Sequence, residues 1–491
     1  MKKTAAVIGG GVIGGGWAAR FLLNGWDVRV SDPDPEAERK ITQVLENARR
    51  SLPGLSDALL PPEGQLSFAA SLEEAVEGAG WVQESVPERL NIKHAVYARV
   101  EAVTGGRTII GSSTSGFRPS QLVEGAAHPG AIMVCHPFNP VYLLPLVELV
   151  PAPQATPAQI DEAREVIESL GMYPLHLKKE IDAHVADRFL EAVWREALWL
   201  VKDGIATTAE IDDAIRYGFG IRWAQMGLFE TYRVAGGEAG MKHFMAQFGP
   251  ALKWPWTKLM DVPEFNDELV NLISDQSDAQ SGAHSIRALE RIRDNNLVAM
   301  LRALKAQDQA AGALLNAHEK TIRAGTILNA RAADIAEPAL PVVTLHRAVP
   351  LDWTDYNGHM TESRYLDAFA QSTDRFMEII GCDAEYIAAG GSYFTAETHI
   401  RHLGEVNAGD VICVRTRVLQ GGGKKMHLWH EMYLGEELVA TGEHFLLHVS
   451  LETRKPVDAG PAVDAALRRF ADAQAGLPRP EGAGRAIGAP R

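Results

Sequence analysis

The sequence predicts three folded parts in one chain: an α/β domain built on a parallel sheet, an all-helical domain, and a smaller α+β domain. With 491 residues, the chain exceeds the size at which a single hydrophobic core stops growing. Over the first 180 residues, short apolar runs such as AAVIG, VRVSD and AIMVCH alternate with helical stretches, which is the pattern of a parallel sheet covered by helices. Strand signals disappear from Asp182 to about Lys320, and runs with a period of two begin after Val342.

The expected boundaries follow from these changes of pattern. The α/β domain covers 1–181 and the helical domain covers 182–322. The small, irregular stretch RAADIAEPALP lies in a predicted linker, 323–341. One amphipathic helix followed by alternating strands and Gly-rich turns indicates an α+β domain over 342–470. The last segment, 471–491, has too little apolar surface to fold and is expected to be a loose tail.

The composition narrows the classes of function. A formal net charge of -15 argues against a nucleic-acid partner, which requires a basic face. No run of 18 apolar residues is present, so no membrane-spanning helix is expected. The three cysteines, Cys135, Cys382 and Cys413, are too few and too scattered for a disulfide framework or a metal site. We therefore expect a protein of the reducing cytoplasm, without a metal.

A glycine-rich segment near the N-terminus predicts a dinucleotide site. VIGGGVIGGG carries the G-x-G-x-x-G spacing between an apolar strand and a helix. The first glycine makes the turn, the second lets the backbone approach a pyrophosphate, and the third packs helix on strand. Asp32 ends the second strand, where a carboxylate accepts both ribose hydroxyls and repels a 2′-phosphate, so NAD is expected rather than NADP. The alternative is a glycine-rich turn that binds nothing. The expected cofactor-binding residues are Gly9, Gly11, Val12, Ile13, Gly14 and Asp32.

A histidine and a glutamate predict the oxidation of an alcohol. Hydride removal from a secondary alcohol requires a base for the hydroxyl proton, and histidine titrates nearest to working pH. His136 in CHPFNP is the candidate base. Glu148 stands on the next apolar segment, where a buried carboxylate fixes the tautomer of the ring and stabilises the imidazolium. Taken singly, His136 is more often a core or turn histidine, and Glu148 a surface charge.

The motifs SSTSGFRPS and CHPFNPVYLLPLVELV, together with the glycine-rich fingerprint, resemble the 3-hydroxyacyl-CoA dehydrogenase superfamily over essentially residues 1 to 320. The resemblance implies a Rossmann domain followed by the all-α C-terminal domain of that superfamily, which serves in dimerisation. It also implies that Ser115 and Asn139 hydrogen bond to the substrate oxygen. Glu88 and Lys93 in VPERLNIKH match positions on the cofactor side.

One position departs from the superfamily pattern. Where the superfamily has an Asn in a GFxxNR helix start, this chain has HVADR, with Asp187 in place of the amide. An acid at this position suggests a substrate with a positive group. Alternatively, Asp187 caps the helix or pairs with Arg188 or Arg222.

The motifs are similar to the branch of the superfamily that acts on small free 3-hydroxy acids such as L-carnitine and L-gulonate, rather than on CoA esters. A quaternary ammonium is held by aromatic faces and a nearby carboxylate, and the helical domain contains half of the ten tryptophans. These are Trp194, Trp199, Trp223, Trp254 and Trp256. L-carnitine is the expected substrate, with Asp187 and Trp223 as candidate contacts and Arg222 as the candidate for its carboxylate. L-gulonate and a 3-hydroxyacyl-CoA are the alternatives.

The segment DWTDYNGHM predicts a second site between a first strand and the amphipathic helix TESRYLDAFAQSTDRFMEIIG. It resembles the Asp-x-x-Gly element of hot-dog-fold acyl-CoA thioesterases of the 4-hydroxybenzoyl-CoA type, which matches Asp355 to Gly358. Thioester hydrolysis needs a carboxylate or base and backbone N–H groups at a helix start. Asp355 is the expected base or nucleophile, and Asn357 and His359 are expected to orient the water or thioester. Alternatively, the segment is only a turn, in a hot-dog domain that dimerises or binds an acyl-CoA without hydrolysing it.

The pairing of the two modules bears on the substrates. Cleavage of 3-dehydrocarnitine with acetyl-CoA gives betainyl-CoA, whose hydrolysis releases glycine betaine, so a thioesterase partner favours L-carnitine over L-gulonate. We expect a homodimer with NAD as cofactor and L-carnitine and betainyl-CoA as substrates. The alternatives are a fusion with a generic acyl-CoA thioesterase and, in a different class, a dehydrogenase fold kept as a structural or binding protein.

Overall fold

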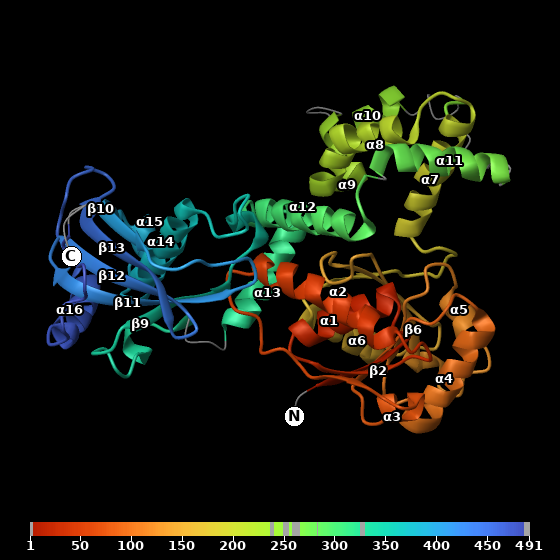
Figure 1. Ribbon diagram of the computed structural model, residues 1–491, viewed down its shortest axis with the longest axis horizontal. Coiled ribbons are helices and arrows are strands. Elements are labelled where there is room, and N and C mark those ends of the chain that lie inside the picture. Colours follow the sequence, from red (N-terminus) through yellow and green to blue (C-terminus); the bar gives the residue numbers. More distant parts are fainter. Residues whose placement is uncertain are drawn as a thin grey trace. The chain divides into compact units, whose positions relative to one another are not determined.

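In the computed structural model, the chain forms two compact units (Figure 1). The first unit consists of Met1–Asn47 and Glu63–Asn316, and the second of Ala48–Pro62 and Ala317–Arg491. The structure describes residues 3–235, 240–248, 255–257, 266–281, 283–324 and 329–485.

The first unit is built on an eight-stranded sheet with the order β3-β2-β1-β4-β5-β6-β7-β8. Strands β1 to β6 run parallel, β7 is antiparallel to β6, and β8 is parallel to β7. The first six strands have the order of a doubly wound dinucleotide-binding fold, in which ligands bind at the carboxyl ends of the strands. The strands are β1 (Thr4–Ile8), β2 (Asp27–Ser31), β3 (Leu66–Phe68), β4 (Trp81–Glu84), β5 (Ile110–Ser112), β6 (Ile132–Pro137), β7 (Leu146–Pro151) and β8 (Tyr173–His176).

Helices connect these strands, and glycines end several of them. The chain leaves the first helix through Gly25 and the fourth through Gly105, both in the left-handed region that favours glycine. Apolar side chains from the strands and helices form one buried cluster that includes Ala6, Val82 and Val100. The helices are α1 (Val12–Leu23), α2 (Ala37–Ser51), α3 (Leu72–Val76), α4 (Leu90–Thr104), α5 (Pro119–Leu122) and α6 (Pro157–Ser169). The predicted α/β domain is confirmed.

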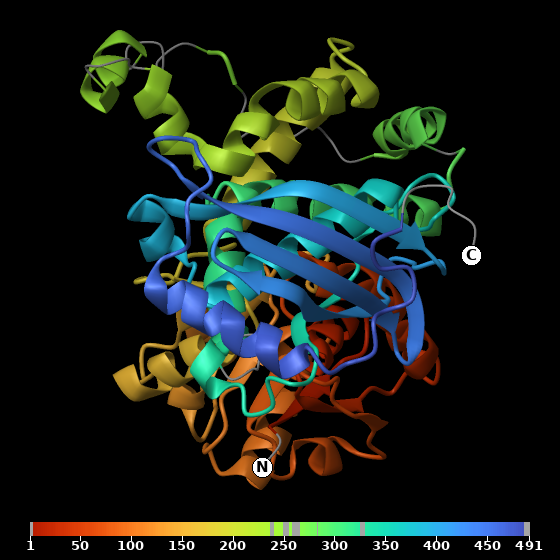
Figure 2. The ribbon, with the colours of Figure 1, turned by 90° about the vertical axis from the view of Figure 1, so that its left-hand side faces the viewer.

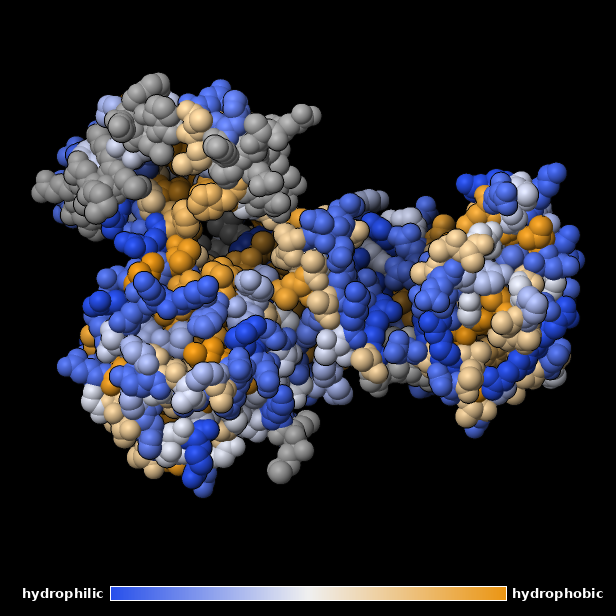
Figure 3. Space-filling model, turned by 180° about the vertical axis from the view of Figure 1, so that it is seen from behind, coloured by the Kyte–Doolittle hydropathy of each residue, from blue (hydrophilic) through white to orange (hydrophobic). Residues whose placement is uncertain are grey.

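In the described residues of the rest of the first unit, helices and their connections follow but no strand, as predicted. Several large apolar side chains remain exposed on them, among them Phe189, Trp194 and Tyr217, and apolar side chains gather on this part of the surface (Figure 3). Trp254, one of the tryptophans considered for substrate binding, lies outside the described residues. The helices are α7 (Ala186–Lys202), α8 (Thr208–Ala214), α9 (Gly220–Ala235), α10 (Gly240–Phe248), α11 (Asp267–Ser281), α12 (Ile286–Ala306) and α13 (Ala311–Arg323), the last of which continues into the second unit.

The second unit contains a five-stranded antiparallel sheet with the order β10-β13-β12-β11-β9 and one long helix, α14 (Glu362–Ile379) (Figure 2). Phe369 and Phe376 on this helix are completely buried, and Phe369 lies against the backbone of Gly442 in β13. This helix and antiparallel sheet confirm the predicted hot-dog domain. The other elements are β9 (Val342–Ala348), α15 (Ala384–Ala388), β10 (Gly391–His402), β11 (Val411–Gly422), β12 (Lys425–Leu434), β13 (Glu437–Ser450) and α16 (Pro461–Gln474).

The segment after this domain contacts the sheet. Helix α16 runs to Gln474, four residues into the segment that was expected to be a loose tail. Arg417 on β11 donates hydrogen bonds to the carbonyls of Leu477 and Pro478, and the N–H of Gly484 donates to the carboxylate of Glu443 on β13. The described part of the tail is therefore tied to the sheet.

Candidate functional sites

The glycine-rich loop between β1 and α1 has the geometry that a dinucleotide requires. A Cβ on Gly9 would lie 2.5 Å from the carbonyl oxygen of Ser85, and one on Gly14 would lie 1.8 Å from that of Gly9, so both positions exclude any side chain. A Cβ on Gly11, in contrast, would meet nothing within 4 Å. Gly11 therefore leaves open space in front of the helix N-terminus, where Val12 is also exposed and Ile13 is half-buried. Space and N–H groups at this place fit a pyrophosphate.

Asp32 directly follows β2, next to this loop. One of its carboxylate oxygens accepts a hydrogen bond from the backbone N–H of Gly10, and the other accepts one from Asp34 at 2.7 Å. The carboxylate is thereby held at the carboxyl edge of the sheet, half-buried, where the ribose of a dinucleotide lies in this fold.

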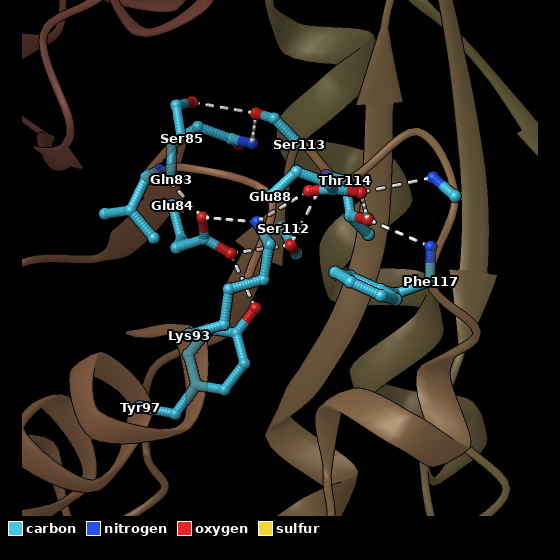
Figure 4. A network of polar contacts seen from close by, with 12 residues as sticks. Gln83, Glu84, Ser85, Glu88, Lys93, Tyr97, Ser112, Ser113, Thr114 and Phe117 are labelled. Atoms are coloured by element: carbon cyan, nitrogen blue, oxygen red, sulfur yellow. Dashed lines mark hydrogen bonds and ion pairs between the residues drawn. The ribbon is translucent and has the colours of Figure 1, made fainter. Parts of the chain in front are cut away.

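A buried polar network lies at the ends of β4 and β5 (Figure 4). Glu84, completely buried, accepts hydrogen bonds from Lys93 at 2.8 Å, Tyr97 at 2.5 Å and Ser112 at 2.6 Å. Lys93 also pairs with Glu88 across 3.3 Å. The buried lysine charge is thus balanced by two carboxylates, one buried and one partly exposed, and the network fixes the strand ends on which the cofactor-side residues stand.

Glu88 connects this network to the loop that follows β5. Its carboxylate accepts a hydrogen bond from the hydroxyl of Thr114 (Figure 4). It also accepts one from the N–H of Gly116. Ser115 lies between these two residues and is exposed, and its hydroxyl makes no hydrogen bond to any described residue. The loop is therefore fixed while the Ser115 hydroxyl stays available to a ligand.

His136 and Glu148 lie opposite each other on β6 and β7. His136 Nδ1 is 3.0 Å from Glu148 Oε2, and both side chains are buried. The other carboxylate oxygen of Glu148 accepts the N–H groups of Val185 and Ala186 at the start of α7. Asn139, three residues after His136, is exposed and makes no side-chain hydrogen bond in the described part of the chain.

These contacts determine the proton on His136. Burial raises the pKa of Glu148, but the hydrogen bonds from His136, Ala186 and Val185 outweigh this and hold the pKa below its ordinary value. Glu148 is therefore an anion that can only accept, so the Nδ1–H of His136 donates to it. Nε2 is then the nitrogen with a free lone pair, as a general base requires.

Two further side chains surround His136. Asp187 Oδ2, at the start of α7, lies 3.7 Å from His136 Nε2. His184 is completely buried, and its Nε2 donates to the carbonyl of Thr114 at 3.2 Å, because that carbonyl can only accept. His184 and Ala183 both have backbone angles in the left-handed region, with φ of 49° and 58°. These constrained residues tie the Ser115 loop to the start of α7.

Arg222 and Trp223 lie on α9, apart from this group. Within the described residues, no contact joins either of them to His136, Glu148 or Asp187, and the Trp223 ring packs against Phe219 at 4.6 Å. The Arg222 side chain is exposed. Their role as substrate contacts stays a prediction.

The segment DWTDYNGHM forms a tight turn before α14. Asp355 accepts the N–H of Asn357 at 2.8 Å, and the N–H of Gly358, which has a φ of 86°, donates to the carbonyl of Asp355. Asn357 is exposed, and His359 Nε2 lies 3.4 Å from Glu405 rather than against Asp355. Only one carboxylate oxygen of Asp355 accepts a hydrogen bond from a described residue, and His359 faces another carboxylate instead of contacting Asp355.

Two general properties bear on other classes of function. None of the described helices is long and apolar enough to cross a membrane. Over the same described ranges, no group of three or more His, Cys, Asp or Glu side chains is placed to hold a metal ion.

Family models match the two units. The model of the 3-hydroxyacyl-CoA dehydrogenase NAD-binding domain matches residues 4–181, and that of the C-terminal domain of the same enzymes matches 184–265. The thioesterase-like superfamily matches 349–467. A solved structure of the NAD⁺-dependent dismutase 5-formyl-3-hydroxy-2-methylpyridine 4-carboxylic acid 5-dehydrogenase is 27% identical, with a TM-score of 0.52 over 62% of this chain and 99% of that chain.

Relatives match the entire chain or its first part. A protein of Ruegeria pomeroyi named L-carnitine dehydrogenase/betainyl-CoA thioesterase is 72% identical over 99% of both chains. A protein of Agrobacterium fabrum with the same name is 56% identical over 99% of this chain and 98% of its own. The L-carnitine dehydrogenase of Pseudomonas putida is 50% identical and covers 63% of this chain and 96% of its own length.

Proposed function

The chain belongs to the family of the fused L-carnitine dehydrogenase/betainyl-CoA thioesterases, and from this premise we propose that it catalyses both reactions. The first unit oxidises L-carnitine to 3-dehydrocarnitine with NAD as cofactor. The second hydrolyses betainyl-CoA to glycine betaine and CoA. The observation that carries the first assignment is the His136–Glu148 pair, which leaves Nε2 free at the same sheet edge as the glycine-rich loop.

In the oxidation, His136 Nε2 accepts the proton of the substrate hydroxyl while hydride leaves the same carbon. NAD⁺, when bound, supplies the acceptor for that hydride. Glu148 holds the ring in the required tautomer and stabilises the imidazolium that forms. In this proposal, Ser115 and Asn139, whose side chains have no partners among the described residues, hydrogen bond the substrate oxygen from the ends of β5 and β6. The cofactor side of the site is formed by Gly9, Gly11, Val12, Ile13, Gly14, Asp32, Glu88 and Lys93.

In the hydrolysis, Asp355 removes a proton from water as the water oxygen attacks the thioester carbonyl, and the CoA thiolate leaves and takes up a proton. Asn357 and His359 orient the water or thioester. Hot-dog domains place such sites at subunit interfaces, and Asp355, which is only half-buried in its turn, supports the same arrangement here. We assign a homodimer in the cytoplasm.

The dehydrogenase assignment is tested with His136→Asn. L-carnitine-dependent NADH formation should fall by about 10²- to 10⁴-fold, the usual contribution of a general base, while the Kd of NADH from fluorescence titration stays the same. His176→Asn, which changes an exposed histidine on β8, is the matched control. Equal loss of activity and NADH affinity would instead indicate a folding defect, and absence of L-carnitine oxidation in the unaltered protein would reject the substrate.

The thioesterase assignment is tested with Asp355→Asn. Release of CoA from betainyl-CoA, followed with a thiol reagent, should fall by about 10²-fold or more because the base is removed, while L-carnitine oxidation is unchanged. Asp352→Asn, which changes an exposed carboxylate in the short helical turn Leu351–Trp353 before it, should keep both activities. Hydrolysis that survives in Asp355→Asn places the site elsewhere in the second unit.

A further inference from the structure

Asp187 occupies an unusual position beside the proposed base. Its Oδ2 lies 3.7 Å from His136 Nε2, the nitrogen that Glu148 leaves free for the substrate hydroxyl. A hydroxyl bound to Nε2 therefore lies close to this carboxylate as well. The side chain is 20% exposed, so the charge is partly shielded from water.

The contacts of Asp187 do not give it a structural role. The helix cap is Val185, and no side chain caps the helix N-terminus. The N–H groups of Val185 and Ala186 are already bound by Glu148. Of the described residues, no lysine or arginine pairs with Asp187, so the expected alternatives, a helix cap or a pair with Arg188 or Arg222, are not formed.

The surroundings also disfavour the charge. Burial and the neighbouring charge of Glu148 raise the pKa of Asp187, and only His136 and His184 act in the opposite direction. The surroundings destabilise the negative charge of this carboxylate, and no lysine or arginine of the described residues balances it. These are the properties expected of a group that binds a cationic ligand.

We infer that Asp187 is the counter-ion of the quaternary ammonium group of the substrate and selects 3-hydroxy acids that carry this charge next to the carbinol. This inference rests on the proposed function. In L-carnitine, one methylene separates the ammonium nitrogen from the carbinol carbon, so a hydroxyl bound at His136 brings the ammonium within a few ångströms of Asp187.

The same placement assists the chemical step. When the O–H proton moves to His136 Nε2 and the C–H bond breaks with its electron pair leaving as hydride, partial positive charge develops at the carbinol carbon. A neighbouring ammonium group opposes this charge. The fixed carboxylate of Asp187 offsets the repulsion, and it does so most strongly in the transition state. Asp187 therefore determines specificity through both binding and rate.

The test compares L-carnitine with an isostere that lacks only the ammonium charge, 3-hydroxy-5,5-dimethylhexanoate of the same configuration, in which carbon replaces nitrogen. Asp187→Asn should lower kcat/KM for L-carnitine on the order of 100-fold, as expected when one partner of a partly buried charge pair is removed. The kcat/KM for the isostere should stay the same or rise. Where the isostere turns over too slowly, its Ki against L-carnitine replaces kcat/KM in the comparison.

Two variants separate charge from structure. Asp187→Glu keeps the charge and should retain most of the preference for L-carnitine. Glu191→Gln removes a carboxylate one turn further along α7, which pairs with Arg195 at 3.5 Å, and should leave the ratio of kcat/KM for the two substrates close to that of the unaltered protein. Equal losses for both substrates in Asp187→Asn, or no loss for either, would overturn the inference. If the unaltered protein oxidises L-carnitine in these cases, the proposed function stands without it.

Discussion

At the scale of single residues, the carboxylates around the two nitrogens of His136 differ in what holds them. Glu148 is fixed by three hydrogen bonds that keep it ionised, whereas Asp187 accepts no hydrogen bond from any described residue and lies in surroundings that raise its pKa. Glu148 orients the His136 ring, and Asp187 can interact with a bound ligand. The division of roles follows from the contacts, since both are carboxylates at similar distances from the same ring.

A third carboxylate, Asp32, is predicted to set the choice of cofactor. Asp32→Asn removes the charge that repels a 2′-phosphate while an amide can still accept the N–H of Gly10. The ratio of kcat/KM for NAD⁺ to that for NADP⁺ should fall on the order of 10- to 100-fold, since one close like-charge contact is relieved. Steady-state kinetics with both cofactors measures the ratio.

Asp34→Asn is the control for this variant, because Asp34 lies two residues on and pairs with Lys40 at the surface. It should leave the ratio unchanged. An unchanged ratio in Asp32→Asn would remove Asp32 from the cofactor assignment.

Residues fixed by their place at a strand end could be predicted from the sequence. Gly9, Asp32 and His136 each follow or end an apolar run, and the rules of parallel sheets bring such ends together. Glu84 and His184 could not be predicted. Glu84 was visible only as an acid in the buried strand WVQES, and its partner Ser112 lies 28 residues away. His184 contacts Thr114 across 70 residues.

At the scale of elements, a chain of polar side chains crosses the core of the hot-dog domain. Thr344 on β9, Thr416 on β11, His430 on β12, Thr373 on α14 and His444 on β13 are joined by hydrogen bonds of 2.6 to 3.1 Å. All five are almost fully buried. In the sequence, the four of these residues that lie on strands fit an ordinary period-two pattern. That pattern does not distinguish a buried histidine from an exposed one. Their partners become apparent only when helix and sheet are packed.

This row of hydrogen-bonded side chains is predicted to make the stability of the second unit sensitive to acid. Burial lowers the pKa of His444 to about 4 and that of His430 well below its ordinary value. The unfolded chain, with histidine pKa values near about 6.5, then binds more protons than the folded one, so stability is complete above about pH 6.5 and is lost as the pH falls toward 4. His444 alone contributes a change on the order of 3 kcal/mol. Thermal unfolding between these pH values measures it.

His444→Asn should flatten this dependence, because the group that takes up the proton on unfolding is gone. His399→Asn, a substitution on the neighbouring strand β10, should keep the slope of the unaltered protein. A slope that is the same in all three proteins would mean that the buried histidines do not control acid stability.

At the scale of the whole molecule, the second unit is not continuous in sequence. Residues Ala48–Pro62, which run from the last turn of α2 to the segment before β3, belong to it. Asp57 in this segment pairs with Arg347 on β9, which is completely buried and stacks on Trp353 at 4.5 Å. Composition and periodicity predict contiguous domains, so a pair separated by 290 residues could not be expected from the sequence.

Asp57→Asn is predicted to destabilise the second unit although the substitution lies within the sequence of the dehydrogenase part. Removing the Asp57 carboxylate takes one partner from the completely buried Arg347 guanidinium. Because Asp57 is 31% exposed, the cost lies below the about 3 to 5 kcal/mol of a fully buried pair. Calorimetry should show a lower Tm for the second unit, and betainyl-CoA hydrolysis should be lost at a lower temperature than in the unaltered protein. L-carnitine oxidation, measured below that temperature, should be unchanged.

The double variant Asp57→Asn/Arg347→Met separates the loss of the pair from other effects of the substitution. Replacing a buried ion pair by groups without charge often leaves the stability unchanged. The double variant should therefore recover most of the Tm lost in Asp57→Asn. Arg347→Met alone should lower the Tm less than Asp57→Asn does. If Asp57→Asn leaves the Tm of the second unit unchanged, the Asp57–Arg347 pair does not contribute to its stability. Recovery in the double variant would instead show that a segment inserted in the dehydrogenase sequence stabilises the hot-dog domain through the charge on Arg347.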